Sequence, residues 1–188
     1  VVVSLLDGAL FRGLRSSDLS RLEGKDWYRL LRVIGYLPTW VVVGLALMLH
    51  DRARRGPARG LLVIGGAVLG GVVAEVAKVG LVRQRPINNG AADGAYVWGT
   101  PLESLWRNAG NYGLPSSHAA VAFAGAFVLG WMFPRARAVF WLLAAGCGFT
   151  RLLAGAHFTS DVYVAACLSY ALCAWLLGNA ALATRGRA

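Results

Sequence analysis

Three short polar clusters lie in the middle of an otherwise apolar chain, each at the edge of a run about long enough to cross a bilayer. Ionisable side chains are costly to place at such edges, so they are functional candidates by default. The clusters comprise, in order, Lys78, Arg83, Arg85 and Pro86; Pro115, Ser116, Ser117 and His118; and Thr150, Arg151, His157 and Asp161.

The cations of these clusters predict a phosphate-binding site. Lys78, Arg85 and Arg151 would bring three positive charges together. The planar guanidinium fork matches phosphate oxygens, and the ammonium adds a point charge. Ser116 and Ser117 stand where a helix is expected to begin, so their hydroxyl and backbone N–H groups can donate to an anion. We therefore expect these five residues to bind a phosphate group.

The two histidines and the aspartate predict transfer chemistry at that phosphate. His157 and Asp161 are four residues apart, which places them on one face of a helix. A carboxylate can hold one imidazole nitrogen as N–H and leave the other free to attack. The predicted reaction is attack of His157 on phosphorus, protonation of the leaving oxygen by His118, and hydrolysis of the phosphohistidine. The cations would stabilise the charge on phosphorus, so no metal or other cofactor is expected.

Structural roles are expected for several other residues. Glu75 lies one turn before Lys78 and is expected to pair with it. Arg83 is expected either to lie near the phosphate site or to contact lipid headgroups rather than the substrate. His50, next to Asp51, is expected to be packed and hydrogen-bonded. The three cysteines form no C-x-x-C motif, so we expect them to pack in the apolar core.

The composition indicates a membrane protein of one domain, residues 1–188. The chain is 57% hydrophobic and 15% charged, with a mean hydropathy of +0.54, whereas soluble domains are about 25% charged. Too few polar residues remain to cover a soluble surface. The net charge of +10 is a possible sign of nucleic-acid binding, but the apolar content favours basic loops that face anionic lipid. We therefore expect the bilayer, and no nucleic acid, as the partner.

Five apolar runs predict spanning helices, and strand-like alternation is absent from the sequence. The expected fold is all-α, a polytopic transmembrane helix bundle of about five to six spans of roughly 20 residues each. Abundant small residues would let these helices pack closely. Residues 1–32 predict one or two short helices at the membrane surface, or the end of a further span. Residues 33–183 are expected to form the helical core. Its five apolar runs lie at residues 33–49, 60–77, 119–133, 138–154 and 162–183.

The loops predict the orientation. Threading five spans puts the arginine-rich segments 51–59 and 134–137 and the C-terminal tail on one side, which the positive-inside rule makes cytoplasmic. All three polar clusters then share the opposite side, which faces the periplasm in a bacterial inner membrane. The long loop 88–114 also lies there. We expect it either to cap the site and select the lipid or to act as an aromatic anchor. Its aromatic and large apolar residues include Tyr96, Trp98, Leu102, Trp106 and Tyr112.

The clusters resemble the signature of the type 2 phosphatidic acid phosphatase (PAP2) superfamily, which includes lipid phosphate phosphatases and vanadium haloperoxidases. That signature reads K-x6-RP, PSGH and SR-x5-H-x3-D. The first motif matches fully, whereas Ser117 replaces the usual Gly and Thr150 the usual Ser. A side chain at residue 117 would either lower activity or add a hydrogen bond. The resemblance implies a PAP2-like core with His118 as acid, His157 as nucleophile and Asp161 as its orienting partner, and phosphate bound by the lysine and both arginines.

The expected function is hydrolysis of a lipid phosphate or diphosphate at the outer leaflet. Polyprenyl diphosphate, phosphatidylglycerophosphate, phosphatidic acid and lipid A phosphates are all candidate substrates. An intramembrane serine hydrolase with Ser116 or Ser117 as nucleophile would leave the three cations unexplained. A vanadate-dependent peroxidase would use the same pocket, but the membrane content argues against it. The remaining alternative is a catalytically weak or inactive PAP2-like protein that only binds lipid. Ser117 in place of the usual Gly favours this alternative, whereas the intact histidines, aspartate and cations argue against it.

Overall fold

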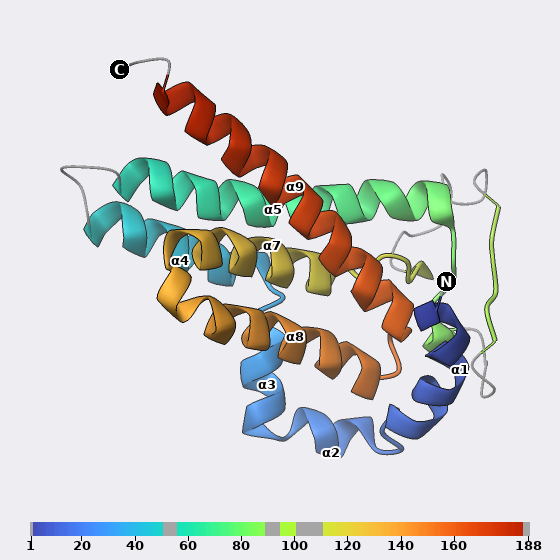
Figure 1. Ribbon diagram of the computed structural model, residues 1–188. Coiled ribbons are helices and arrows are strands. Elements are labelled where there is room, and N and C mark those ends of the chain that lie inside the picture. Colours follow the sequence, from blue (N-terminus) through green and yellow to red (C-terminus); the bar gives the residue numbers. More distant parts are fainter. Residues whose placement is uncertain (1, 51–55, 89–94, 101–110, 186–188) are drawn as a thin grey trace.

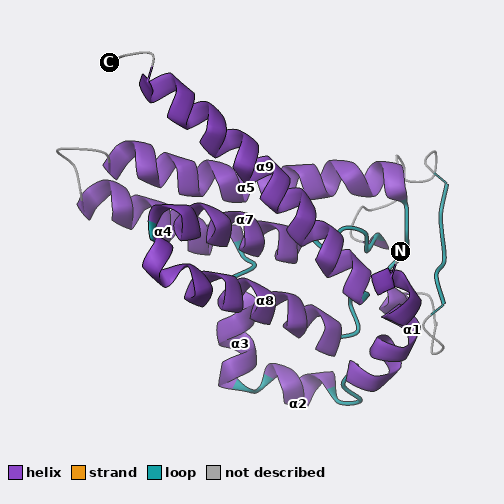
Figure 2. Cartoon of the chain, viewed as in Figure 1, coloured by secondary structure: helices purple, strands orange, loops and turns teal. Residues whose placement is uncertain are grey.

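The computed structural model describes residues 2–50, 56–88, 95–100 and 111–185, and these residues are helical apart from their connections (Figure 1; Figure 2). Within that part of the chain, β pairing is limited to two isolated bridges, Arg83 with Trp98 and Gln84 with Tyr112. The elements are α1 (Val2–Leu14), α2 (Leu19–Glu23), α3 (Asp26–Val33), α4 (Leu37–His50), α5 (Gly56–Leu81), η1 (Pro86–Asn88), α7 (Ser117–Met132), η3 (Pro134–Ala136), α8 (Arg137–Leu153) and α9 (Thr159–Arg185).

Each of the five predicted spans corresponds to one helix, namely α4, α5, α7, α8 or α9. In the part of the chain that the structure describes, three segments are long and apolar enough to cross a membrane: α5, Pro134–Leu153 and Thr159–Asn179. The pair α3 and α4, bent by 68°, forms either a fourth, broken span or a re-entrant loop. The apolar helix α7 has only 16 residues. The predicted all-α membrane bundle is confirmed.

Helix α7 is the centre of the bundle, because it packs against α5, α8 and α9 (Figure 1). Small residues bring the backbones close together. A Cβ atom added at Gly70 of α5 would lie 2.7 Å from the Cβ atom of Ala124 in α7. Between α4 and α5, a Cβ atom on Gly60 would lie 2.3 Å from the carbonyl oxygen of Gly44. Side chains at these glycines would force the helices apart.

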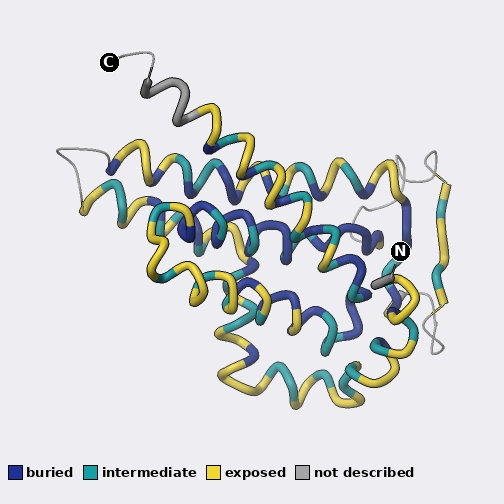
Figure 3. Tube along the Cα trace, viewed as in Figure 1, coloured by how far each residue is buried: buried dark blue, intermediate teal, exposed yellow. Residues whose placement is uncertain are grey.

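Large apolar side chains cover the outer faces of the bundle, whereas α7 is mostly buried (Figure 3). A soluble protein rarely exposes so much contiguous apolar surface. Lipid chains would cover these faces in a bilayer. The most exposed examples on the spanning helices are Val42, Leu61, Val76, Leu142 and Trp175.

The N-terminal region forms three helices, one more than the sequence predicted. Helix α3 packs on α8, and α1 packs on α8 and α9. Figure 1 shows α1 beside the first turns of α9. The placement of residues 1–32 at a membrane surface stays a prediction.

Four helix ends converge beside α1: the last turns of α5 and α8 and the first turns of α7 and α9 (Figure 1). The three polar clusters lie on these ends. The other end of the bundle carries exposed arginines, including Arg59, Arg135 and Arg137. The bundle thus separates the expected phosphate site from these three arginines.

Candidate active site

A glycine turn after α8 places His157 next to α9. Gly155 has a φ of +64°, a left-handed conformation that glycine adopts without steric cost. Its N–H donates to the carbonyl of Leu152 at 2.9 Å, and the N–H of Ala156 donates to that of Arg151 at 3.1 Å. These two bonds form a Schellman motif, which ends the helix and reverses the chain. His157 therefore lies in the connection, and not on a helix with Asp161 as predicted.

The end of α5 is also marked by a left-handed residue. Val82 has a φ of 40°, which β-branched residues rarely adopt, and its N–H donates to the carbonyl of Lys78 at 2.9 Å. The chain then turns inward, and segment 82–85 lies between two parts of the long loop. Gln84 N–H donates to Val97 on one side, and Arg85 N–H donates to Asn111 on the other, both at 2.9 Å.

Ser116 links the start of α7 to α9. Its hydroxyl is the N-cap of α7 and accepts from the N–H of Ala119 at 3.5 Å, a long contact. Its own N–H donates to the carbonyl of Asp161 at 3.2 Å. Ser116 is fully buried. Among the described residues, its contacts are therefore those of a helix cap.

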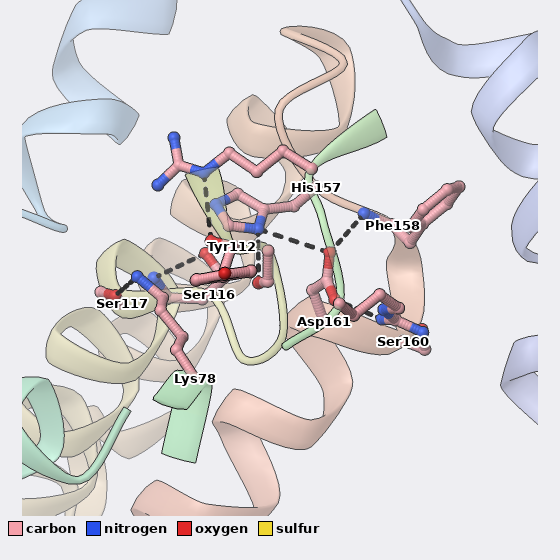
Figure 4. Close-up of polar contacts among 12 residues, drawn as sticks. Lys78, Tyr112, Ser116, Ser117, His157, Phe158, Ser160 and Asp161 are labelled. Atoms are coloured by element: carbon pink, nitrogen blue, oxygen red, sulfur yellow. Dashed lines mark hydrogen bonds and ion pairs between the residues drawn. The ribbon is translucent and has the colours of Figure 1, made fainter. Parts of the chain in front are cut away.

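The ring of His157 has one nitrogen fixed by its surroundings. Nδ1 lies 2.9 Å from the carbonyl oxygen of Gly113 and 3.4 Å from Oδ2 of Asp161. Both oxygens only accept, so Nδ1 carries the proton and Nε2 keeps a free lone pair. Burial lowers the pKa of His157 to about 4, so the ring is neutral at pH 7. In Figure 4 Asp161 lies on one side of this ring, and Lys78 and Ser117 lie on the other.

The carboxylate of Asp161 is held by donors from two segments of the chain. Oδ2 accepts from the N–H of Phe158 at 2.8 Å, and Oδ1 accepts from Nη2 of Arg83. Both members of this ion pair are buried. The expectation that Arg83 contacts lipid headgroups is therefore wrong, because Val82 turns the chain so that Arg83 points into the protein.

Lys78 is bound by two partners on the other side of the site. The buried ammonium donates to Oε1 of Glu75 at 2.8 Å, which confirms the predicted pair, and to the hydroxyl of Ser117 at 2.5 Å. Since Lys78 can only donate, the hydroxyl proton of Ser117 points to Glu75, 2.5 Å away. The side chain at residue 117 thus adds hydrogen bonds, one of the two outcomes that the sequence left open.

Several polar groups in this region lack a full set of partners. Nε2 of His118 and Nε of Arg151 are buried and have no hydrogen-bond partner among the described residues. Among the described residues, the guanidinium of Arg85 donates a single long bond of 3.3 Å, from Nε to the carbonyl of Tyr112. Arg85, Arg151 and His157 all lie within electrostatic range of His118. Buried donors without partners favour an anionic ligand that can accept from them.

The sequence did not reveal three contributors to this region: Asp7, Ser160 and the carbonyl of Gly113. Gly113 offers no sequence signal, because its side chain takes no part. Asp7 was detectable in principle as the one acid in an apolar helix. In the long loop, Tyr96 and Trp98 lie against Arg83, with ring centroids 4.7 and 5.9 Å from its guanidinium carbon. The predicted capping residues Leu102 and Trp106 lie outside the described residues.

Comparisons with known proteins identify the family and the fold. Residues 59–183 match the model of the PAP2 superfamily, and this segment contains every predicted site residue. A crystal structure of a transmembrane PAP2-type phosphatidylglycerophosphate phosphatase from Bacillus subtilis is similar, with a TM-score of 0.58. The match covers 94% of this chain and 85% of that chain at 18% identity, which shows a shared fold. No curated protein sequence matches the chain.

Proposed function

Because the chain belongs to the PAP2 superfamily, we propose that it is an integral membrane phosphatase that hydrolyses a lipid phosphate or diphosphate through a phosphohistidine. The observation that carries this proposal is the state of His157. Its Nδ1 proton is held by Gly113 and Asp161, and its Nε2 is left as the nucleophilic atom. The neutral ring needs no base to activate it.

In the proposed first step, Nε2 of His157 attacks phosphorus, and the bond between phosphorus and the lipid oxygen breaks. His118 gives its proton to that oxygen as it leaves. The positive charge that develops on His157 is stabilised by Asp161. His118 then takes a proton from water, whose oxygen attacks phosphorus and releases His157 and inorganic phosphate. Side-chain cations stabilise the phosphoryl oxygens throughout, from Lys78, Arg85 and Arg151.

An apolar groove supports a lipid rather than a water-soluble substrate. It has a volume of about 560 Å³, runs between the start of α4 and the helices α5 and α7, and ends at Ser117 and His118. A phosphate bound at His118 could therefore extend an acyl or prenyl chain into apolar surroundings. The groove is lined by residues that include Tyr36, Leu37, Val68, Val72, Glu75 and Val121.

The arginines that connect the spanning helices support one orientation of the protein. The exposed arginines Arg59, Arg135 and Arg137 belong to the first turn of α5, to η3 and to the start of α8, at the end of the bundle away from the site. The positive-inside rule assigns that end to the cytoplasm. We infer that the site opens to the periplasm of a bacterial inner membrane.

The serine hydrolase alternative gains no support from the geometry. The hydroxyl of Ser116 caps α7, and that of Ser117 is shared by Lys78 and Glu75. Among the described residues, neither hydroxyl is hydrogen-bonded to His157. A serine nucleophile needs such a bond to its base.

The proposal is tested by phosphate release from detergent-solubilised lipids in EDTA. The panel contains a polyprenyl diphosphate, phosphatidylglycerophosphate, phosphatidic acid and a lipid A phosphate. We expect release from at least one lipid, at a rate that EDTA does not change. Release that stops in EDTA would contradict the metal-free mechanism, and no release from any lipid would favour the binding-only alternative.

A Glu75→Gln variant is expected to bind phosphate more tightly and to be less stable. The carboxylate occupies Lys78 and would repel a phosphate that approaches it. Its side chain is 50% exposed, so we expect a loss of about 0.5–1 kcal/mol in the free energy of unfolding. Inhibition by vanadate, a phosphate analogue, should become roughly 3- to 10-fold tighter. Thermal unfolding and vanadate titration measure the two effects.

The control for that variant is Glu23→Gln, which removes a half-buried ion pair with Arg32 whose atoms lie 2.7 Å apart. It should lower stability by a similar amount and leave vanadate inhibition unchanged. Weaker inhibition in Glu75→Gln would show instead that Glu75 is needed to hold Lys78 in its binding position.

A His118→Gln variant is expected to lose activity selectively. Protonation matters for the alkoxide of a lipid phosphate, which leaves poorly without a proton. It matters little for p-nitrophenyl phosphate, whose phenolate is stable. We therefore expect a loss of roughly 10²- to 10⁴-fold with lipid substrates and a much smaller loss with p-nitrophenyl phosphate. Equal losses with both substrates would rule out the proton-donor role.

A further inference from the structure

Asp7 is a buried acid on a helix that exposes its apolar neighbours. It is the only acidic residue of α1, and it is 1% exposed, whereas Leu5 is 78% exposed. Its carboxylate accepts from the hydroxyl of Tyr96 at 2.6 Å, the N–H of Ser160 at 2.9 Å and the hydroxyl of Ser160. A carboxylate is stable in such a place only when it is hydrogen-bonded in this way. The helix α1 thus brings a negative charge to the first turn of α9.

The hydroxyl of Ser160 connects Asp7 to Arg83. Nη2 of Arg83 donates to this oxygen at 2.7 Å. Arginine can only donate, so the oxygen accepts from Arg83 and has one proton to give, which goes to Asp7. A charged group therefore fixes the hydroxyl on each side.

Arg83 connects this hydroxyl to Asp161. Nη2 has two protons, and its two acceptors are the hydroxyl of Ser160 and Oδ1 of Asp161. The rings of Tyr96 and Phe158 lie 4.7 and 5.4 Å from the guanidinium carbon and limit its movement. An unbroken series of hydrogen bonds runs from α1 to the carboxylate that faces His157 (Figure 4 shows its inner part).

We propose that Asp7 is a positioning residue of the active site, which acts through Ser160 and Arg83 to fix the Asp161 carboxylate that orients His157. This assignment rests on the proposed phosphatase function. It also makes α1 part of the catalytic unit, although α1 lies outside the segment that matches the family, residues 59–183. The ring of Phe11 supports the same docking, because it lies 5.5 Å from the ring of Phe158.

The test combines Asp7→Asn, Ser160→Ala and the double variant. Asp7→Asn keeps the size of the side chain and removes its charge. We expect kcat to fall roughly 10- to 100-fold, by analogy with the outer partners of metal-bound histidines. KM should change little, because Lys78, Arg85 and Arg151 are not part of the series. The amplitude of the first-turnover phosphoenzyme counts the folded sites, so that kcat refers to active protein.

The double variant separates positioning from a general structural role. If Asp7 and Ser160 act through one series of contacts, the double variant loses no more kcat than the worse single variant. Independent effects on folding would multiply, and that result would overturn the proposal. Ser160→Ala removes a single atom, so it carries the test by itself if Asp7→Asn does not fold.

The matched control is Asp18→Asn. Asp18 lies in the same N-terminal region, is exposed, and accepts from the N–H of Arg21 and the hydroxyl of Ser20 rather than from the site. Its kcat should equal that of the wild type. Wild-type kcat in both Asp7→Asn and Ser160→Ala would overturn this assignment alone. A wild type that releases no phosphate would overturn the proposed function, and this assignment with it.

Discussion

A His157→Ala variant is expected to release phosphate at least about 10³-fold more slowly than the wild type. The reason is that Nε2 of His157 is the atom proposed to bond to phosphorus, and alanine offers no substitute. The cations would still bind the lipid, so KM or vanadate inhibition should change far less than kcat. Steady-state release from the preferred lipid measures the loss, and vanadate titration confirms that the site remains formed.

The control for this variant is His50→Ala, at the opposite end of the bundle, where α4 ends. Both substitutions remove an imidazole, but only one of them lies near the three cations. His50→Ala should keep wild-type kcat. A His157→Ala protein with substantial release would exclude the covalent mechanism and would require water to attack phosphorus directly.

The second large effect is expected for Asp161→Asn. The amide cannot neutralise the buried Arg83, and it no longer stabilises positive charge on His157. We expect kcat to fall about 10³- to 10⁴-fold, as when the aspartate of a comparable triad becomes an amide. The loss of one partner from a buried ion pair should also cost about 3–5 kcal/mol in the free energy of unfolding. Activity measured well below the unfolding temperature separates these effects.

Asp26→Asn is the control, because Asp26 is exposed on α3 and far along the chain from the site. It should be indistinguishable from the wild type in both measurements.

The carbonyl oxygen of Gly113 is closer to Nδ1 of His157 than Oδ2 of Asp161 is, at 2.9 Å against 3.4 Å. A near-normal kcat in Asp161→Asn would therefore mean that Gly113 alone orients the ring, and the role assigned to Asp161 would be wrong.

The spanning helices could be predicted because long apolar runs and small residues determine them. The prediction for 119–133 differs from α7 by two residues or fewer at each end. The start of the first span was less accurate, since the run from residue 33 is broken and α4 begins at Leu37. Gly35 lies against Cys147 and His118 where a side chain would not fit, and Pro38 is suited to a first helical turn.

The site was predictable where it depends on spacing and not where it depends on distant contacts. Helix ends bring Lys78, Ser117 and Asp161 together, and these ends could be read from the sequence. The inward turn of Arg83 could not, because it follows from a left-handed valine that residue preferences disfavour. The contact between Asp7 and Ser160 joins residues 153 positions apart. No local pattern encodes such a pair.

The central claim is that His157 forms a covalent bond to phosphorus, and rapid quenching with a ³²P-labelled lipid phosphate tests it most directly. The account predicts an acid-labile, base-stable phosphoprotein in EDTA, with the label on the peptide that contains His157 and no label in His157→Ala. A wild type that releases phosphate without any labelled intermediate, or with the label on Ser116 or Ser117, would contradict it.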